Sequence, residues 1–158
     1  MDFSDPLADF VRAWEGCSLV PHWDALGNVW DIGYGHVILP NENRRQLTQT
    51  EAEELLYWDL HIVAEGVNRL VHVPVMQCQF DALCSFAFNV GLDEDDDVIA
   101  EGLGDSTLLK RLNAGNYESA ATQFTLWVNA GGKVVRGLLN RRLAEQAMFV
   151  NGDYSGRP

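Results

Sequence analysis

Basic residues are scarce in this sequence, with 11 lysines and arginines against 23 aspartates and glutamates, which gives a formal net charge of −12 over 158 residues. Nucleic-acid binding depends on clustered lysine and arginine side chains that neutralise phosphates. This charge balance argues against such clusters, so we expect no nucleic-acid partner. Net charge informs association and solubility rather than fold, and it leaves the fold class open.

Cysteines and long apolar runs are also few. The three cysteines, Cys17, Cys78 and Cys84, have no spacing typical of metal ligands and are interpreted as buried thiols of a reducing compartment. Residues 1–16 (MDFSDPLADFVRAWEG) have no basic start and no uninterrupted apolar run, which argues against a signal peptide. No other stretch is long enough to span a bilayer. We therefore expect a soluble cytoplasmic protein, without stable membrane insertion, bound metal or cofactor.

The apolar content, at 47% of the residues, is sufficient for one compact domain over residues 1–158. The run Ser4-Asp5-Pro6 predicts the start of a helix, and Gly16 predicts its end. Residues 17–38 carry a Gly-Asn turn at 27–28 between aromatic and β-branched segments, a pattern typical of a small β-hairpin.

The rest of the chain shows helical periodicity. Thr48 and Glu51 form a capping box at the start of a long helix that Pro74 ends. Further helices are predicted over 75–90, 106–115, 117–128 and after the glycines at 131–132. The predicted fold class is α+β, mainly α, with a β-hairpin lobe over about 17–38 and a larger helical lobe over about 48–152. A cleft between two such lobes suits a long polymer substrate.

Three carboxylates are candidates for chemistry. Glu15 is expected in the last turn of the first helix, where the negative end of the helix dipole and burial beside Trp14 both favour its protonated form. A carboxyl group that keeps its proton can protonate a leaving-group oxygen. Asp24 and Asp31 flank the hairpin turn, and one acid facing one carboxylate is the minimum for glycoside hydrolysis. The alternative is a solvated glutamate and two turn aspartates that bond locally to the backbone.

These residues carry a resemblance to a known family. Trp14-Glu15-Gly16, Asp24 and residues 29–36 (VWDIGYGH) resemble the active-site signature of phage-type lysozymes, glycoside hydrolase family 24. The similarity continues through residues 47–59, 79–91, 106–109 and 136–145, at compatible spacing. It implies a lysozyme-like fold, with the active-site cleft between the two lobes.

The resemblance also implies an activity and a setting. The chain would be an endolysin, a muramidase that hydrolyses the β-1,4 bond between N-acetylmuramic acid and N-acetylglucosamine in peptidoglycan. It would act as a monomer on glycan strands. It would stay in the host bacterial cytoplasm until a holin lesion releases it to the cell wall.

The family pattern further implies roles for individual residues. Glu15 would be the general acid, and Asp24 the carboxylate that activates water or stabilises the oxocarbenium-like state. His36 would pair with Asp59 as a structural link between the sheet and the long helix. The remaining matched positions would contact the sugar or the acid: they are Phe88, Asn89 and one arginine of Arg136, Arg141 and Arg142, for which we take Arg141.

The chain departs from the family pattern at Asp31, where the family has a threonine whose hydroxyl helps to hold the attacking water. Asp31 could act as the general base with inversion, act as a nucleophile with retention, or impair the site by crowding three carboxylates. We favour the first. One extra residue between Asp24 and the Ile-Gly pair also makes the alignment of Asp24 less certain than that of Glu15. A lytic transglycosylase and a catalytically impaired peptidoglycan-binding module are the alternative functions.

A second departure is the acidic segment 93–97. Its aspartates resemble a calcium loop, but Val98 occupies the position of the required glycine and no glutamate closes the loop. A solvated surface loop is the preferred interpretation.

Overall fold

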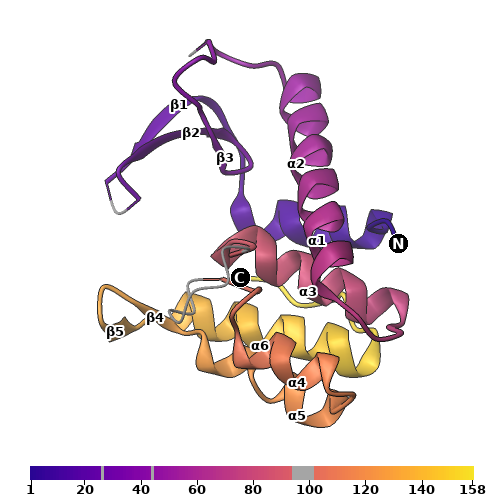
Figure 1. Cartoon of the computed structure of the whole chain (residues 1–158). Helices are drawn as coiled ribbons and strands as arrows, with labels where there is room; N and C mark the ends of the chain where they lie inside the picture. The colour runs from indigo at the N-terminus through magenta and orange to yellow at the C-terminus, as the bar shows by residue number, and fades with distance from the viewer. Residues whose placement is uncertain (26, 44, 94–101) are drawn as a thin grey trace.

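The computed structural model describes residues 1–158 except residues 26, 44 and 94–101. Its elements follow the predicted order, and a mainly helical α+β fold is confirmed (Figure 1). The helices and strands are α1 (Asp5–Glu15), β1 (Ser18–Asp24), β2 (Val29–Gly33), β3 (His36–Val37), α2 (Gln49–Leu70), α3 (Gln77–Val90), α4 (Thr107–Asn113), α5 (Tyr117–Ala121), the 3-10 helix η1 (Phe124–Leu126), β4 (Asn129–Ala130), β5 (Lys133–Val134) and α6 (Arg136–Asn151).

The first three strands form an antiparallel sheet in the order β1-β2-β3. In Figure 1 this sheet lies beside the upper part of α2, away from α4, α5 and α6. The turn between β1 and β2 is closed by Asp24, whose Oδ2 accepts a hydrogen bond of 3.0 Å from the backbone N–H of Gly27. Asn28 has a φ of 54°, a conformation that asparagine tolerates better than most residues. Local turn chemistry therefore sets the hairpin where the sequence predicted it.

Helix α3 is the centre of the helical lobe, where it packs against α2 and α6. All its residues from Gln79 to Ala87 are buried, as expected for a helix that is apolar on every side. Aromatic rings fill the space between α3, η1 and α6. The rings of Phe86 and Phe124 are T-shaped with their centroids 5.5 Å apart, and the ring centroids of Phe124 and Phe149 are 5.6 Å apart. Close packing of this core holds α3, η1 and α6 in fixed positions relative to one another.

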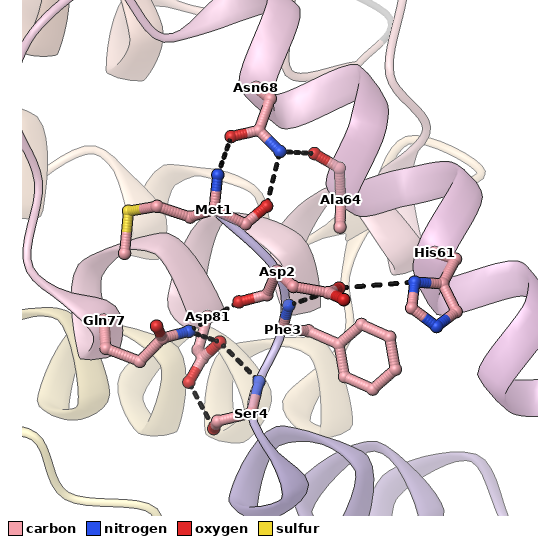
Figure 2. Close-up of polar contacts among 9 residues, drawn as sticks. All are labelled: Met1, Asp2, Phe3, Ser4, His61, Ala64, Asn68, Gln77 and Asp81. Atoms are coloured by element: carbon pink, nitrogen blue, oxygen red, sulfur yellow. Dashed lines mark hydrogen bonds and ion pairs between the residues drawn. The ribbon is translucent and has the colours of Figure 1, made fainter.

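The start of α1 is tied to α2 and α3 by side-chain hydrogen bonds (Figure 2). The sequence predicts Ser4 as the helix cap, but its side chain makes no capping hydrogen bond. Instead, Ser4 Oγ donates to Oδ2 of the buried Asp81 at 2.6 Å, and the Ser4 N–H donates to Oδ1 at 3.2 Å. Asp81 also accepts from Gln77 and Tyr154. Ser4 is the N-cap residue of α1, so the predicted helix start is confirmed, but its hydroxyl bonds to a buried carboxylate on α3 instead of capping the helix.

Two further expectations differ from the structure. The helix predicted over 117–128 is divided into α5 and η1, where the Thr122 hydroxyl donates back to the Ser119 carbonyl at 2.8 Å, a bond that competes with helix propagation. The segment before α6 forms a second hairpin, β4–β5, whose turn places Gly131 and Gly132 at φ values of 55° and 76°. Both values are readily adopted by glycine, and two such residues in succession suit a tight hairpin turn.

The cysteines are only partly as predicted. Cys84 is buried and burial raises the pKa of its thiol, but Cys17 is exposed and Cys78 is half-buried. All three are free thiols. No helix among the described residues has the length and apolar character needed to cross a membrane.

Candidate active site

Glu15 is the last residue of α1, and the chain turns sharply after it because Gly16 adopts a φ of 66°. Its carboxylate is mostly shielded from solvent, with 19% of the side chain exposed. A methyl group added at Gly35, in the turn between β2 and β3, would lie 3.8 Å from Glu15 Oε2. Gly35 has a φ of 89°, which side-chain-bearing residues rarely adopt, so this turn brings bare backbone beside the carboxylate.

Arg141 on α6 contacts the other oxygen of Glu15. Its Nη1 lies 2.5 Å from Glu15 Oε1, and Arg141 is almost completely buried. The contact is an ion pair between the end of α1 and α6. Of the three arginines considered, Arg141 is therefore the one that approaches the predicted acid.

Arg141 is held from behind by a buried cluster. Its Nε donates to Oε1 of Glu145, which is fully buried one turn further along α6. Ser85 Oγ on α3 donates to the same oxygen at 2.8 Å, and Arg142 Nε lies 2.8 Å from Glu145 Oε2. Burial raises the pKa of Glu145, while Arg142 and Arg141 oppose that change. Sequence reasoning did not single out Glu145, although the spacing Arg141 to Glu145 is that of a helical ion pair.

Asp24 and Asp31 lie on the same face of the β1–β2 hairpin. In the strand register His22 is opposite Asp31, and Asp24 is opposite Val29. Because side chains alternate between the two faces of a sheet, Asp24 and Asp31 are diagonal neighbours on one face. Asp31 has a cross-strand partner, His22, with Nδ1 3.6 Å from Oδ1. The structure thus brings the two predicted aspartates together, with a histidine beside them.

His36 and Asp59 connect the sheet to α2. His36 Nδ1 lies 3.0 Å from both carboxylate oxygens of Asp59, and its Nε2 lies 3.3 Å from Glu42 Oε2. The hydrogen bond to Asp59 raises the pKa of His36, burial opposes it, and Glu42 adds to the rise. The imidazole therefore favours its charged form between two carboxylates.

A second link between the lobes uses Tyr34, the residue before Gly35. The Tyr34 hydroxyl donates to Glu53 Oε1 on α2, and Arg12 Nε on α1 lies 2.5 Å from Glu53 Oε2. Burial and the hydrogen bond to Glu53 raise the pKa of Tyr34 to about 12. The three side chains come from three elements, so this network fixes the Tyr34-Gly35 turn relative to the helix that carries Glu15. It was not apparent in the sequence because nothing local connects its members.

Three surface cavities are linked to this site through the residues that line them. A cavity of about 280 Å³, which we call the sheet pocket, is lined by Gly35, His36, Asp59 and Phe88, among others. A second, of about 310 Å³, is called the Trp14 pocket and is lined by Trp14, Asn89, Val135, Gly137, Leu138, Arg141 and Pro158. A third, of about 430 Å³, is called the Trp127 pocket and is lined by Asn89, Val90, Leu126, Trp127, Asn129 and Leu138.

Two of the pockets are lined by residues next to the predicted acid. Arg141, which pairs with Glu15, lines the Trp14 pocket, and Gly35, where an added Cβ would lie 3.8 Å from Glu15 Oε2, lines the sheet pocket. The Trp14 and Trp127 pockets share Asn89 and Leu138. Neighbours of Glu15 therefore line two of the cavities, and the third adjoins the second, which gives a hollowed surface suited to an extended chain. Phe88 and Asn89, predicted to line the sugar cleft, lie in these pockets.

The described residues contain no cluster of three or more histidine, cysteine or acidic side chains placed to hold a metal ion. In the acidic segment 93–97 only Asp93 is described, and its Oδ2 accepts a hydrogen bond from the Gly102 N–H at 2.9 Å. The interpretation of positions 94–97 as a solvated loop lies outside the described residues.

Several known proteins are similar to this chain in sequence and in fold. Residues 12–145 match the family model described as phage lysozyme. The endolysin of Salmonella phage P22 is 38% identical over 141 residues, which cover 87% of this chain and 90% of the P22 protein. The endolysin of Bacillus phage B103 is 43% identical over 154 residues, and these cover 97% of this chain but 56% of the B103 protein. The chain thus spans little more than half the length of that relative.

A solved structure shows the same fold. The muramidase domain of SpmX from Asticaccaulis excentricus superposes with a TM-score of 0.80 at 32% identity, over 95% of this chain and 98% of the SpmX domain.

Proposed function

The chain belongs to the phage lysozyme family, and on this basis we propose that it hydrolyses the β-1,4 bond between N-acetylmuramic acid and N-acetylglucosamine in peptidoglycan. The observation that carries this proposal is the position of Glu15, a shielded carboxyl whose neighbours Gly35 and Arg141 line two cavities that suit an extended glycan. Glu15 is the general acid in this scheme. It donates its proton to the glycosidic oxygen as the bond from that oxygen to the anomeric carbon breaks.

Arg141 contributes to this step after the proton has moved. Once Glu15 has given up its proton it is a carboxylate, and the Arg141 guanidinium at 2.5 Å stabilises that charge. Glu145 and Ser85 hold Arg141 in place, so the stabilising cation needs little reorganisation during the reaction. Arg141 therefore lowers the energy of the state that follows proton donation.

The hairpin aspartates act opposite the acid. Asp31 takes a proton from water as the water oxygen bonds to the anomeric carbon, which inverts the configuration, and Asp24 stabilises the positive charge that develops on the sugar. Their shared face supports this division, because both carboxylates can reach one sugar ring from the same side of the sheet. His22 lies against Asp31 at 3.6 Å and can help to orient it.

Residues 1–158 are proposed to form one catalytic domain, with the sheet lobe over about 17–38 and the helical lobe over about 48–152. The substrate is the glycan strand of peptidoglycan, and the domain acts as a monomer, without cofactor or metal. We further propose that it works as an endolysin, with holin-dependent release to the cell wall. The name "endolysin" borne by the P22 and B103 relatives supports this assignment.

The test compares wild-type protein with Glu15→Gln on purified sacculi. Gln keeps the size of the side chain and an oxygen for Arg141 but has no acidic proton, so the rate of turbidity loss should fall about 10²–10⁴-fold. Glu54→Gln, at an exposed position of α2, is the matched control and should clear sacculi at the wild-type rate. Equal clearing by wild type and Glu15→Gln would contradict the assignment of the acid.

The products distinguish the remaining functions. Mass spectrometry of digested sacculi should show reducing-end N-acetylmuramic acid, because water is the attacking group. Anhydromuramyl ends would instead identify a lytic transglycosylase. If wild type and Glu15→Gln both sediment with sacculi and neither releases fragments, the chain is a peptidoglycan-binding module.

A further inference from the structure

The Trp14 pocket contains two nitrogen donors without acceptors. Arg141 uses Nη1 for Glu15 and Nε for Glu145, but its Nη2 has no hydrogen-bond partner among the described residues. The indole Nε1 of Trp14 likewise has none within the described part of the chain. Both atoms are shielded from solvent, and both residues line the pocket. A buried donor left without an acceptor is unfavourable, so the two donors favour a ligand that supplies one.

Asn89, on the same pocket wall, adds donors of its own. Its Oδ1 accepts a hydrogen bond of 2.9 Å from Arg142 Nη2. With the oxygen engaged by a buried arginine, the part of the carboxamide left for a ligand is the Nδ2–H₂ group. The polar groups that Trp14, Asn89 and Arg141 offer to this pocket are thus all donors, so the group that binds there is an acceptor.

The charge balance favours a neutral acceptor over an anion. Arg141 and Arg142 are matched by Glu15 and Glu145, with two cations against two carboxylates in one network. No net positive charge remains to offset an anion brought out of water. A carbonyl oxygen meets the same donors with a smaller desolvation cost.

The rest of the wall is mainly aliphatic, and part of it is exposed to solvent. Leu138 and Val135 present aliphatic side chains to the pocket. Val135, Gly137 and Pro158 are exposed, so a ligand can approach the pocket from that side. A group that fits is therefore a carbonyl joined to a small apolar substituent. The acetamido group of an amino sugar has this composition.

We propose that the Trp14 pocket is the subsite that recognises an N-acetyl group of the glycan. Trp14 Nε1 and Arg141 Nη2 donate to the acetamido carbonyl oxygen, and the methyl group packs against Leu138 and Val135. Because Arg141 holds Glu15 with its other η nitrogen, occupation of this subsite places the sugar relative to the acid. This inference rests on the proposed function, and it adds that the chain distinguishes acetylated from de-N-acetylated peptidoglycan.

The direct test follows the indole N–H signals in a ¹⁵N-labelled protein. The chain has five tryptophans, and Trp14→Phe identifies the Trp14 signal by its disappearance. A peptidoglycan tetrasaccharide without stem peptides should shift the Trp14 signal, whereas the same tetrasaccharide after chemical de-N-acetylation should not. If the protein hydrolyses the acetylated tetrasaccharide during the measurement, the products still carry acetamido groups. The comparison with the de-N-acetylated sugar is therefore unaffected. The signal of Trp58, exposed on the outer side of α2, is the internal reference.

A rate measurement gives the second readout. Trp14→Phe keeps an aromatic ring against Phe10 but removes the donor, so the preference for native over de-N-acetylated sacculi should fall about three- to tenfold, mainly through KM. Trp58→Phe should retain the full preference. A Trp14 signal that fails to shift, or that shifts equally with both sugars, overturns the subsite. If wild type still cleaves native sacculi in that case, the proposed function stands without the subsite. If native sacculi stay intact, both the subsite and the proposed function are contradicted.

Discussion

Arg141 Nη1 lies 2.5 Å from Glu15 Oε1, although the two residues are 126 positions apart in the sequence. The contact joins the end of α1 to α6, and it places a buried guanidinium beside the carboxyl that the sequence identifies as the acid. Glu145 accepts a hydrogen bond from Arg141 Nε on the other side of the guanidinium, and Ser85 donates to the same Glu145 oxygen.

The first prediction concerns this contact. Arg141→Gln should lower the free energy of unfolding by about 2–4 kcal/mol, because it leaves the carboxylates of Glu15 and Glu145 without a shared cation. Arg141→Lys keeps the charge but loses the fork of donors, and it should cost less than Arg141→Gln. Urea denaturation measures both. Equal stability of the two variants would indicate that charge plays no part in the contact.

The second prediction separates the hairpin aspartates. Asp31→Asn should reduce the rate on sacculi about 10²–10⁴-fold, because the general base is lost. Stability should change by less than about 1 kcal/mol, since the pair with His22 is largely exposed. His22→Ala is the matched control, and it should keep most of the activity because the carboxylate remains.

The same series includes Asp24→Asn. An active Asp31→Asn together with an inactive Asp24→Asn would transfer the role of base to Asp24. Loss of activity in both, with no change in folding, would fit the assigned division between base and electrostatic partner.

The third prediction is a pH dependence of stability. The hydrogen bond that His36 donates to Asp59 raises the pKa of His36 above its ordinary value of 6.5, against the effect of burial. Because the folded-state pKa is the higher one, the stabilisation is complete below about pH 6.5 and is lost as the pH rises through the folded-state pKa. His36→Gln should therefore cost about 1–3 kcal/mol at pH 6 and clearly less at pH 9.

Thermal or urea unfolding at the two pH values measures this difference. His72→Gln is the control, because His72 Nε2 contacts the Arg69 carbonyl at 3.1 Å and has no carboxylate partner in the described part of the chain. Its effect should be the same at pH 6 and pH 9. A His36→Gln effect that grows with pH would contradict the assigned direction.

The fourth prediction concerns the buried carboxylate of Asp81, which accepts hydrogen bonds from Ser4, Gln77 and Tyr154 (Figure 2). Asn offers one acceptor oxygen in place of two, so Asp81→Asn should lower the free energy of unfolding by about 2–3 kcal/mol. The kcat on sacculi should stay within about threefold of wild type below the melting temperature, because Asp81 lies at the opposite end of α1 from Glu15. Asp153→Asn, at an exposed position, is the control and should unfold at close to the wild-type urea midpoint.

Much of the fold was predictable because its signals are local. Pro6 and Gly16 mark the two ends of α1, and Thr48 caps α2 through a side chain that accepts from the Glu51 N–H. The Gly27-Asn28 turn places the first hairpin. Such signals act within a few residues of each other, so they can be recognised from the sequence alone.

Other features depend on partners that are distant in sequence. The hydroxyl of Ser4 is diverted from its cap by Asp81, and the Tyr34-Gly35 turn is held by Glu53 and Arg12. The hairpin β4–β5 has too few residues for a recognisable strand pattern. The contacts of Ser4 and Tyr34 join residues too far apart in the sequence for helix or strand patterns to reveal them.

The sequence by itself determined that Glu15 ends the first helix and that Asp24 and Asp31 flank a hairpin turn, because helix caps and turn residues act locally. Only the tertiary structure decided which arginine reaches Glu15. Arg136, Arg141 and Arg142 share one helix, and the docking of α6 against α3 turns Arg141 toward the acid and buries Arg142 over Phe86. That choice depends on the rotation of one helix against another, which only the packed core establishes.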